Sequence, residues 1–292
     1  VALVAPASPV PPERLSPAVE AVRALGLEPV VYPSCRPEHR RGYLAAPDPV
    51  RAGDIQAAFC DNSIAGVLCI RGGYGANRIL PLLDWAAIAR HPKVFAGYSD
   101  ITALHIVLNQ RCGLVTYHTI MPSTEYWEPV DPFSMGELRR ALFGGLTGVL
   151  PLPERAVPVP LAPGRAEGVL CGGNLTLVCA SLGTPWEIDT RGKLLFLEDI
   201  GEKPRRIDAM LTQLRNAGKF ADCAGVILGA WTDCPEEEGD LPLEESFREL
   251  ILPAGKPVLA GVPCGHVLPT WSLPLGARAV LDAGAGRLEV LS

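Results

Sequence analysis

The first half of the chain alternates short apolar runs with stretches of helical periodicity, and this alternation limits the possible folds more than any other feature. We expect strands at 1–5, 28–32, 66–70, 94–96 and 114–117. We expect helices between them at 16–25, 54–59, 79–89 and 102–108. Strands that alternate with crossover helices form a parallel sheet with helices on both faces. The sequence therefore predicts an α/β fold whose functional residues lie at the carboxyl ends of the strands.

A proline-rich segment divides the chain. Residues 151–165 contain five prolines and little periodicity, which is typical of a linker. We therefore expect one domain over 1–150 and a second over 166–292. In the second domain we expect strands at 194–197, 225–228 and 288–291, and a helix at 207–217.

The composition excludes several classes of protein. The net charge of the 292 residues is −6, and no block of Lys and Arg exceeds two residues, so neither a nucleic acid nor an anionic membrane is an expected partner. The long uncharged stretches 168–186 and 257–277 contain several Gly and Pro and predict buried strands and turns rather than membrane spans. Residues 1–5 are too short and lack the basic region of a signal peptide. We expect a soluble cytoplasmic protein.

Cysteine usage points to a reducing compartment. The nine cysteines are odd in number, form no C-x-x-C pair, and several lie inside apolar runs. This pattern favours small buried side chains over a disulfide framework or a zinc site. No metal-ligand spacing is present in the sequence, so we expect neither a metal nor another cofactor.

Ser99 follows an apolar run and a glycine and is the strongest candidate nucleophile. The chain reads GYSDITALH at 97–105, and a helical pattern begins with Asp100. A serine on a strand-to-helix turn projects its hydroxyl out of the sheet, close to N–H groups that can bind an oxyanion. The match to the nucleophile-elbow pattern G-x-S-x-G is partial, because Ile101 occupies the fifth position. The alternative is a serine that caps the helix or lies in a loop.

A nucleophilic serine needs a base, and two of the five histidines suit that role. His118 ends an expected strand and could reach a cleft. His266 lies in a loop rich in Gly and Pro within an apolar region, where the alternative is a satisfied core histidine. His105 lies six residues after Ser99 on the following helix, so it points away from the turn and is expected to be structural.

Two further segments could complete such a site. Glu198 and Asp199 follow the expected strand 194–197, where a carboxylate is well placed to orient a base or, alternatively, to cap a helix or pair with an arginine. The segment RGGYG at 71–75 also follows a strand, and its glycines let backbone N–H groups approach an anion. It lacks the lysine and the spacing of nucleotide-binding loops. We expect one of its N–H groups and that of Asp100 to hold an oxyanion beside Ser99.

Four motifs in order resemble the LD-carboxypeptidase family of serine peptidases. They are IRGGYGANRILPLLD at 70–84, GYSDITALH at 97–105, LFLEDIGE at 195–202, and GH at 265–266 followed by LPLG at 273–276. The likeness runs nearly from end to end. It implies a catalytic triad of Ser99, Glu198 and His266, with the oxyanion bound by the N–H groups of Gly73 and Asp100.

The resemblance also implies a fold, a substrate and an assembly. The family fold is a flavodoxin-like domain joined to a smaller β-rich C-terminal domain, which would carry Glu198 and His266, usually in a homodimer. The usual substrate is a murein tetrapeptide, which loses its terminal D-alanine during cell-wall recycling. Close relatives instead cleave processed microcin C, an aspartyl nucleotide analogue, and so confer immunity. We expect the murein reaction, with the microcin-type reaction as an alternative; a binding protein with a silent triad would show affinity without turnover.

The substrate pocket is the part of the family pattern from which this chain departs. We expect contacts from Tyr74, Asn77, Tyr126 and Trp127. The last two could stack on a nucleobase or sugar, or could pack together on the surface. After the histidine at 118 the family commonly has Gly-Pro-Met where this chain has TIM, and after Glu202 it has Pro-Tyr-x-Ile-Asp-Arg where this chain has KPRRIDA. These differences leave the choice of substrate open.

Overall fold

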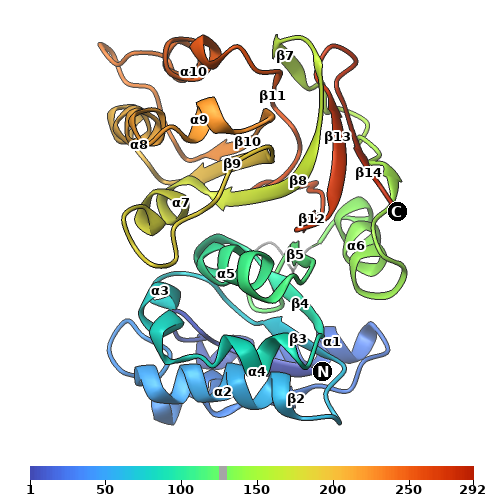
Figure 1. Cartoon of the computed structure of the whole chain (residues 1–292). Coiled ribbons are helices and arrows are strands. Elements are labelled where there is room, and N and C mark those ends of the chain that lie inside the picture. The colour runs from blue at the N-terminus through green and yellow to red at the C-terminus, as the bar shows by residue number, and fades with distance from the viewer. Residues whose placement is uncertain (125–129) are drawn as a thin grey trace.

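The computed structural model describes residues 1–124 and 130–292, which form two sheets that lie one above the other in Figure 1. The first sheet has the order β12-β5-β4-β3-β1-β2. Its parallel strands are β1 (Ala2–Val4), β2 (Val30–Val31), β3 (Gly66–Cys69), β4 (Val94–Gly97) and β5 (Thr116–His118). The edge strand β12 (Leu273–Leu275) is antiparallel to β5. The predicted α/β class is confirmed.

Helices cover both faces of the first sheet. Successive strand residues point to opposite faces, and those of the central strands are apolar, so each face needs a layer of helices to bury its side chains. These helices are α1 (Pro12–Ala24), α2 (Asp48–Cys60), α3 (Ala76–Ile79), α4 (Trp85–Ala89) and α5 (Thr102–Cys112). Val4 and Phe95 pack in the core beneath α2 and α5, whereas Leu3 and Ala96 pack beneath α1.

The helix expected at 79–89 is divided in the structure. A 3-10 turn spans Leu80–Leu82 and contains Pro81, which cannot donate a hydrogen bond inside an α-helix. The chain restarts at α4, where Asp84 Oδ1 accepts a hydrogen bond from the backbone N–H of Ala87 at 2.9 Å. A proline and a capping aspartate therefore replace one long helix with two short ones.

The second sheet has eight strands in the order β6-β14-β13-β8-β9-β10-β11-β7. Four parallel strands form its centre: β8 (Arg165–Asn174), β9 (Leu194–Ile200), β10 (Gly225–Thr232) and β11 (Val258–Ala260). Antiparallel strands flank them: β6 (Gly148–Val149), β7 (Val159–Ala162), β13 (Arg278–Asp282) and β14 (Arg287–Val290). The helices of this half are α6 (Pro132–Arg139), α7 (Leu175–Ser181), α8 (Pro204–Asn216), α9 (Lys219–Asp222) and α10 (Leu243–Leu250).

The proline-rich segment 151–165 contains strand β7 in addition to irregular chain, which differs from the expected plain linker. Pro160 lies within β7 opposite Leu259, and β7 is the edge of its sheet. A proline is tolerated on an edge strand because the missing N–H faces away from the neighbouring strand. The division into 1–150 and 166–292 stays a prediction, and two short strands, β6 and β12, cross it.

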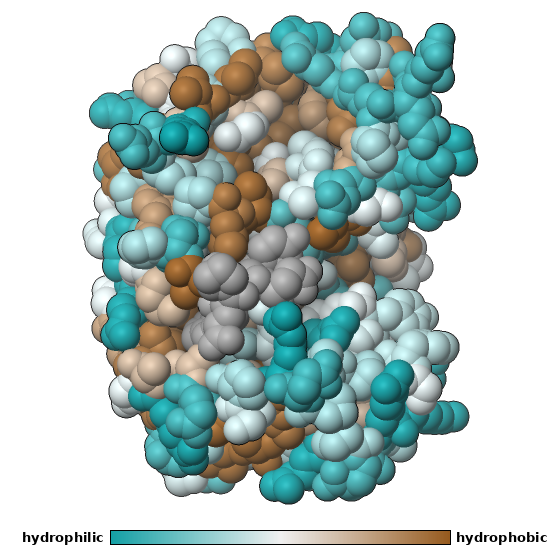
Figure 2. Space-filling view, turned by 180° about the vertical axis from the view of Figure 1, so that it is seen from behind, coloured by the Kyte–Doolittle hydropathy of each residue, from teal (hydrophilic) through white to brown (hydrophobic). Residues whose placement is uncertain are grey.

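The surface combines polar and apolar areas. Viewed from behind, Figure 2 shows hydrophilic side chains over much of both halves and hydrophobic side chains in separate patches. Among the described residues, no helix is both long enough and apolar enough to cross a membrane.

Candidate active site

Ser99 lies on a tight turn between β4 and α5, as the sequence predicted. Its φ is +65°, which makes it one of two non-glycine residues with positive φ in the described part of the chain. This left-handed backbone region is unfavourable for residues other than glycine. Backbone strain of this kind is concentrated at functional sites. At Gly97 a Cβ would lie 2.9 Å from Cys69 Cβ, so only glycine lets β4 approach β3 closely before the turn.

The glycine-rich loop 71–75 packs directly against this turn. A Cβ on Gly72 would lie 3.2 Å from Ser99 Oγ, so the loop backbone runs beside the hydroxyl. Gly73 has a φ of +108°, and a Cβ there would overlap Ser8 Oγ at 2.3 Å. Glycine at 72 therefore lets the loop backbone pass beside Ser99, and glycine at 73 lets it pack against Ser8.

Asp100 holds the turn and the loop together. Its carboxylate is buried, and Oδ2 accepts a hydrogen bond from the backbone N–H of Ala76 at 2.7 Å. Burial raises the pKa of Asp100 to about 6, and the hydrogen bond from Ala76 partly opposes that rise. The side chain thus has a structural role, while its backbone N–H belongs to the turn that carries Ser99.

Glu198 and His266 meet at the ends of the second sheet. Glu198 is in β9 and fully buried, and its Oε2 lies 2.7 Å from His266 Nδ1. The same oxygen accepts a hydrogen bond from the backbone N–H of His266 at 3.3 Å. A carboxylate on Nδ1 selects the tautomer in which Nδ1 carries the proton, so Nε2 is the basic nitrogen of the neutral ring.

Gly265 is the residue that makes this pairing possible. Its φ is +114°, and a Cβ at this position would lie 2.6 Å from Glu198 Oε2. Any side chain there would displace the carboxylate. The Gly-His sequence at 265–266 therefore has a direct structural reason.

Ser99 and His266 line the same cavity, which has a volume of about 280 Å³. Gly72 and Gly73 line it from the first half of the chain, and Ile200 lines it from the end of β9. The ring of His266 also lies against that of Tyr98, with 4.7 Å between the ring centroids. The cavity thus brings together the candidate nucleophile, its glycine-rich loop and the candidate base.

Asp199, the other carboxylate considered at this strand end, has a different task. Its Oδ1 accepts a hydrogen bond from Asn174 Nδ2 at 2.8 Å, and its Oδ2 accepts one from the backbone N–H of Thr176 at 3.0 Å. It therefore stabilises the start of α7, which is the capping role that the sequence left open.

The other histidines near the turn are buried in the core. His105 has Nδ1 2.8 Å from Thr116 Oγ1 and Nε2 2.9 Å from the Gly97 carbonyl oxygen, which confirms its structural role. His118 is fully buried, and neither ring nitrogen has a hydrogen-bond partner among the described residues. Burial holds the pKa of His118 well below its ordinary value, so the ring stays neutral. It does not line the cavity of Ser99 as the structure describes it.

The expected substrate contacts are not all brought to the cavity. Tyr74 is 55% exposed and packs edge-on against Tyr43, with 5.6 Å between ring centroids. Neither Tyr74 nor Asn77, which lies in α3, is among the described residues that line the cavity. Tyr126 and Trp127 lie outside the described residues.

Sequence reasoning missed two charged residues of the cavity wall, Arg14 and Arg71. Arg71 is the first residue of the glycine-rich loop 71–75, so its position after a buried strand was an available signal. Arg14 lies in the first turn of α1, where the sequence offers no such signal.

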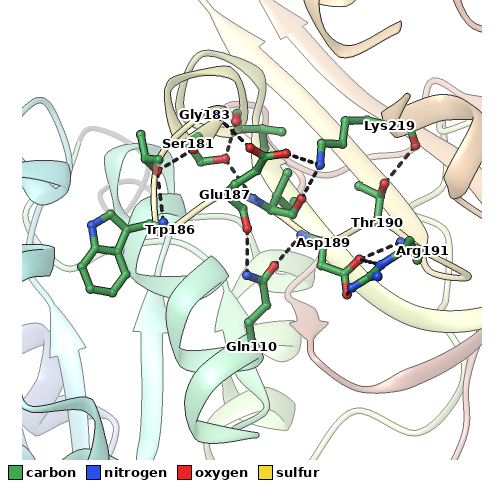
Figure 3. A network of polar contacts seen from close by, with 12 residues as sticks. Gln110, Ser181, Gly183, Trp186, Glu187, Asp189, Thr190, Arg191 and Lys219 are labelled. Carbon is green, nitrogen blue, oxygen red and sulfur yellow. Dashed lines mark hydrogen bonds and ion pairs between the residues drawn. The ribbon is translucent and has the colours of Figure 1, made fainter. Parts of the chain in front are cut away.

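A cluster of hydrogen bonds between Gln110 of α5 and the backbone of Glu187 and Asp189, which we call the clasp, joins the two halves of the chain (Figure 3). Gln110 Nε2 donates to the Glu187 carbonyl oxygen at 3.0 Å, and Gln110 Oε1 accepts from the backbone N–H of Asp189 at 2.7 Å. Arg111 donates to the Pro185 carbonyl oxygen at 2.7 Å and lies 4.2 Å above the ring of Trp186. The loop between α7 and β9 is thereby fixed on α5, whose first turn follows Ser99.

Comparison with known families gives two matches that together cover most of the chain. The model of the LD-carboxypeptidase N-terminal domain matches residues 1–119, and that of the LD-carboxypeptidase C-terminal domain matches residues 167–281.

Individual relatives match over nearly the full length. The chain is 41% identical to the probable murein peptide carboxypeptidase of Bacillus subtilis over 97% of this chain and 88% of that protein. It is 32% identical to the murein tetrapeptide carboxypeptidase of Pseudomonas aeruginosa over 97% of this chain and 92% of that protein.

Solved structures share the fold. The muramoyltetrapeptide carboxypeptidase from Oxalobacter formigenes superposes with a TM-score of 0.87 at 29% identity, covering 100% of this chain and 98% of that one. The MccF protein in complex with glutamyl sulfamoyl guanosine superposes with a TM-score of 0.91 at 22% identity, covering 100% of this chain and 95% of that one.

Proposed function

This chain belongs to the LD-carboxypeptidase family and is a serine-type hydrolase, and we propose that it removes the terminal D-amino acid of murein tetrapeptides through a triad of Ser99, Glu198 and His266. One observation carries the assignment of the triad. His266 is bound to buried Glu198 at 2.7 Å and shares one cavity with Ser99, although the three residues come from distant parts of the chain. The relatives named as murein peptidases support the substrate class.

In the first half of the reaction, Ser99 Oγ attacks the carbonyl carbon of the scissile amide. His266 Nε2 takes the hydroxyl proton, and the negative charge of Glu198 stabilises the imidazolium that forms. The carbonyl oxygen becomes an oxyanion held by the backbone N–H groups of Gly73 and Asp100. Each such donor typically contributes about 3–4 kcal/mol to lowering the barrier.

In the second half, His266 passes the proton to the leaving group. It protonates the nitrogen of the D-amino acid, the C–N bond breaks, and the shortened peptide stays on Ser99 as an ester. A water molecule then loses a proton to His266 and attacks the ester carbonyl. The peptide leaves with a carboxylate, and Ser99 recovers its hydroxyl proton.

The test uses two substrates with the same purified protein. A murein tetrapeptide and an aspartyl sulfamoyl-adenosine conjugate are incubated separately, and the products are followed by mass spectrometry. We expect loss of D-alanine from the tetrapeptide. Cleavage of the conjugate alone would instead assign the protein to the microcin-type reaction, and cleavage of neither substrate would contradict both readings.

Variants test the triad. We expect Ser99→Ala and His266→Ala each to reduce kcat by about 10³-fold or more, since members of a triad act as a unit. Ser63→Ala, at an exposed loop serine, is the matched control and should keep full activity. Full activity of folded Ser99→Ala would exclude Ser99 as the nucleophile, and ligand binding without turnover by the unaltered protein would indicate a silent triad.

The resemblance to the family also leads us to propose that the protein acts in the cytoplasm as a homodimer. Sedimentation velocity at micromolar concentration should give twice the mass of the 31.1 kDa chain, and a single-chain mass would exclude the dimer.

A further inference from the structure

The candidate active-site cavity has a positive wall. Arg14 and Arg71 line it together with Ser99 and His266, and no Asp or Glu lines it among the residues that the structure describes. Both arginine side chains are half-buried. Charged groups that are partly removed from water need an opposite charge or good hydrogen bonds.

The two guanidinium groups have no carboxylate partner within residues 1–124 and 130–292. The side-chain hydrogen bonds found for them there go to backbone carbonyls: Arg71 Nη1 to Pro9 at 3.3 Å and Arg14 Nη1 to Ser123 at 3.4 Å. Glu13 borders the two neighbouring cavities that these arginines also reach, yet it forms no ion pair with either. Within the described part of the chain, no carboxylate neutralises their positive charge, which suits an anion in the cavity.

The position of Arg71 in the chain brings its positive charge close to Ser99, where the scissile bond would lie. Arg71 directly precedes Gly72, whose backbone passes beside Ser99 Oγ, and Gly73, the proposed oxyanion donor. A single amino acid beyond the scissile bond spans only about 3.8 Å between consecutive Cα atoms. The carboxylate of a terminal residue must therefore lie close to the scissile bond, in the cavity that Arg71 and Arg14 line.

We propose that Arg71 and Arg14 bind the terminal carboxylate of the substrate and so restrict the enzyme to the last peptide bond. This inference rests on the proposed function. A guanidinium group pairs with a carboxylate through two parallel N–H donors, a geometry that an uncharged amide cannot match. A peptide that continued past this point would present an amide there and leave two partly desolvated positive charges without an anionic partner.

The test compares two forms of one substrate. A murein tetrapeptide with a free terminal carboxylate and the same peptide with a terminal amide are cleaved by the unaltered protein, Arg71→Gln and Arg14→Gln, and kcat/KM is measured for each. The unaltered protein should strongly prefer the free carboxylate. Each variant should lose about 10- to 100-fold on that substrate, mainly through KM, and little on the amide. Arg71→Lys, which keeps the charge, should recover part of the preference.

The outcomes separate this inference from the proposed function. Arg287→Gln changes an exposed arginine of β14 and should leave both kcat/KM values unaltered. Equal losses on the two substrates, or an unchanged preference in both cavity variants, would overturn the carboxylate site while leaving the murein reaction intact. Failure of the unaltered protein to cleave the free tetrapeptide would contradict the proposed function instead.

Discussion

At the residue scale, a missing side chain is as important to the candidate active site as any that is present. Gly265 leaves space for the Glu198 carboxylate beside His266, because a Cβ there would lie 2.6 Å from Oε2. Its φ of +114° adds a second requirement for glycine, since other residues are strained in that conformation.

We therefore predict that Gly265→Ala lowers kcat/KM by about 100-fold or more, because the methyl group displaces the carboxylate that orients the base. The measurement is steady-state hydrolysis of the tetrapeptide, with circular dichroism to monitor folding. Gly284→Ala is the matched control, since a Cβ at Gly284 meets neighbouring atoms only at the ordinary distance of 3.7 Å. Normal activity of Gly265→Ala would show that Glu198 does not need its observed position.

Asp100 gives a prediction about pH and stability. Its pKa is about 6 in the folded protein, against 3.8 for an ordinary aspartate, so the folded state binds the proton more tightly than the unfolded state. The resulting contribution to stability is fully present below about pH 4 and is lost as the pH rises through 6. A difference of about 2 pKa units corresponds to about 3 kcal/mol.

The measurement is urea unfolding of the unaltered protein and of Asp100→Asn between pH 4 and pH 7. Relative to the variant, the unaltered protein should lose about 3 kcal/mol of unfolding free energy over that range. A difference that does not change with pH would show that burial of Asp100 is not linked to its protonation.

Ser99, Glu198 and His266 each lie in a short motif that could be recognised in the sequence, and the structure pairs Glu198 with His266 and puts His266 in one cavity with Ser99. Their catalytic roles stay a prediction. The sequence was not sufficient for the cavity wall. Arg71 donates a hydrogen bond to the carbonyl of Pro9, which lies 62 positions earlier in the sequence. Contacts between such distant residues are created only by the folded chain. Tyr74 was expected to contact substrate, but in the structure its ring packs on Tyr43 and is not among the described residues that line the cavity.

At the element scale, α5 connects the turn of Ser99 to the second sheet. Its first turn follows Ser99, and near its other end Gln110 binds the backbone of the loop that leads into β9, the strand of Glu198. Secondary structure was predictable where an apolar run was free of proline, as in β3, β4 and α5. It was less predictable where proline has two opposite uses: Pro81 ends a helix, whereas Pro160 is accepted in the edge strand β7.

We predict that Gln110→Ala lowers the free energy of unfolding by about 0.5–1.5 kcal/mol, because the carbonyl of Glu187 and the N–H of Asp189 lose their partner and, being exposed, bond to water instead. The rate of hydrolysis should also fall several-fold, since α5 is less firmly held relative to β9. Urea unfolding and steady-state kinetics measure the two effects. Gln213→Ala, on the exposed side of α8, is the control, and equal behaviour of both variants would exclude a role for the clasp.

At the scale of the whole molecule, the two sheets are linked by a strand that pairs with one sheet and packs its side chains in the core of the other. Strand β12 forms hydrogen-bonded pairs with β5 of the first sheet. The side chains of Leu273 and Leu275 pack instead in a core with Phe196 of the second sheet. Ser272, just before β12, lies with its Oγ 2.6 Å from Thr119 Oγ1. Loss of either half would therefore remove contacts from the other.

We predict that the protein unfolds in one cooperative transition despite having two sheets. Differential scanning calorimetry should show a single peak whose calorimetric enthalpy equals the van't Hoff enthalpy. Two separate peaks, or a calorimetric enthalpy well above the van't Hoff value, would indicate that the halves unfold independently.

The shared strand also affects how the protein is made. Ser99 and β5 are synthesised early, whereas β12 follows His118 by 155 residues, and His266 precedes it by only a few. At about 5–20 residues per second, the ribosome needs about 8–30 s to cover that interval, during which the edge of β5 stays open. The candidate nucleophile and its candidate base can thus come together only late in synthesis, and we expect a partly made chain to lack hydrolase activity.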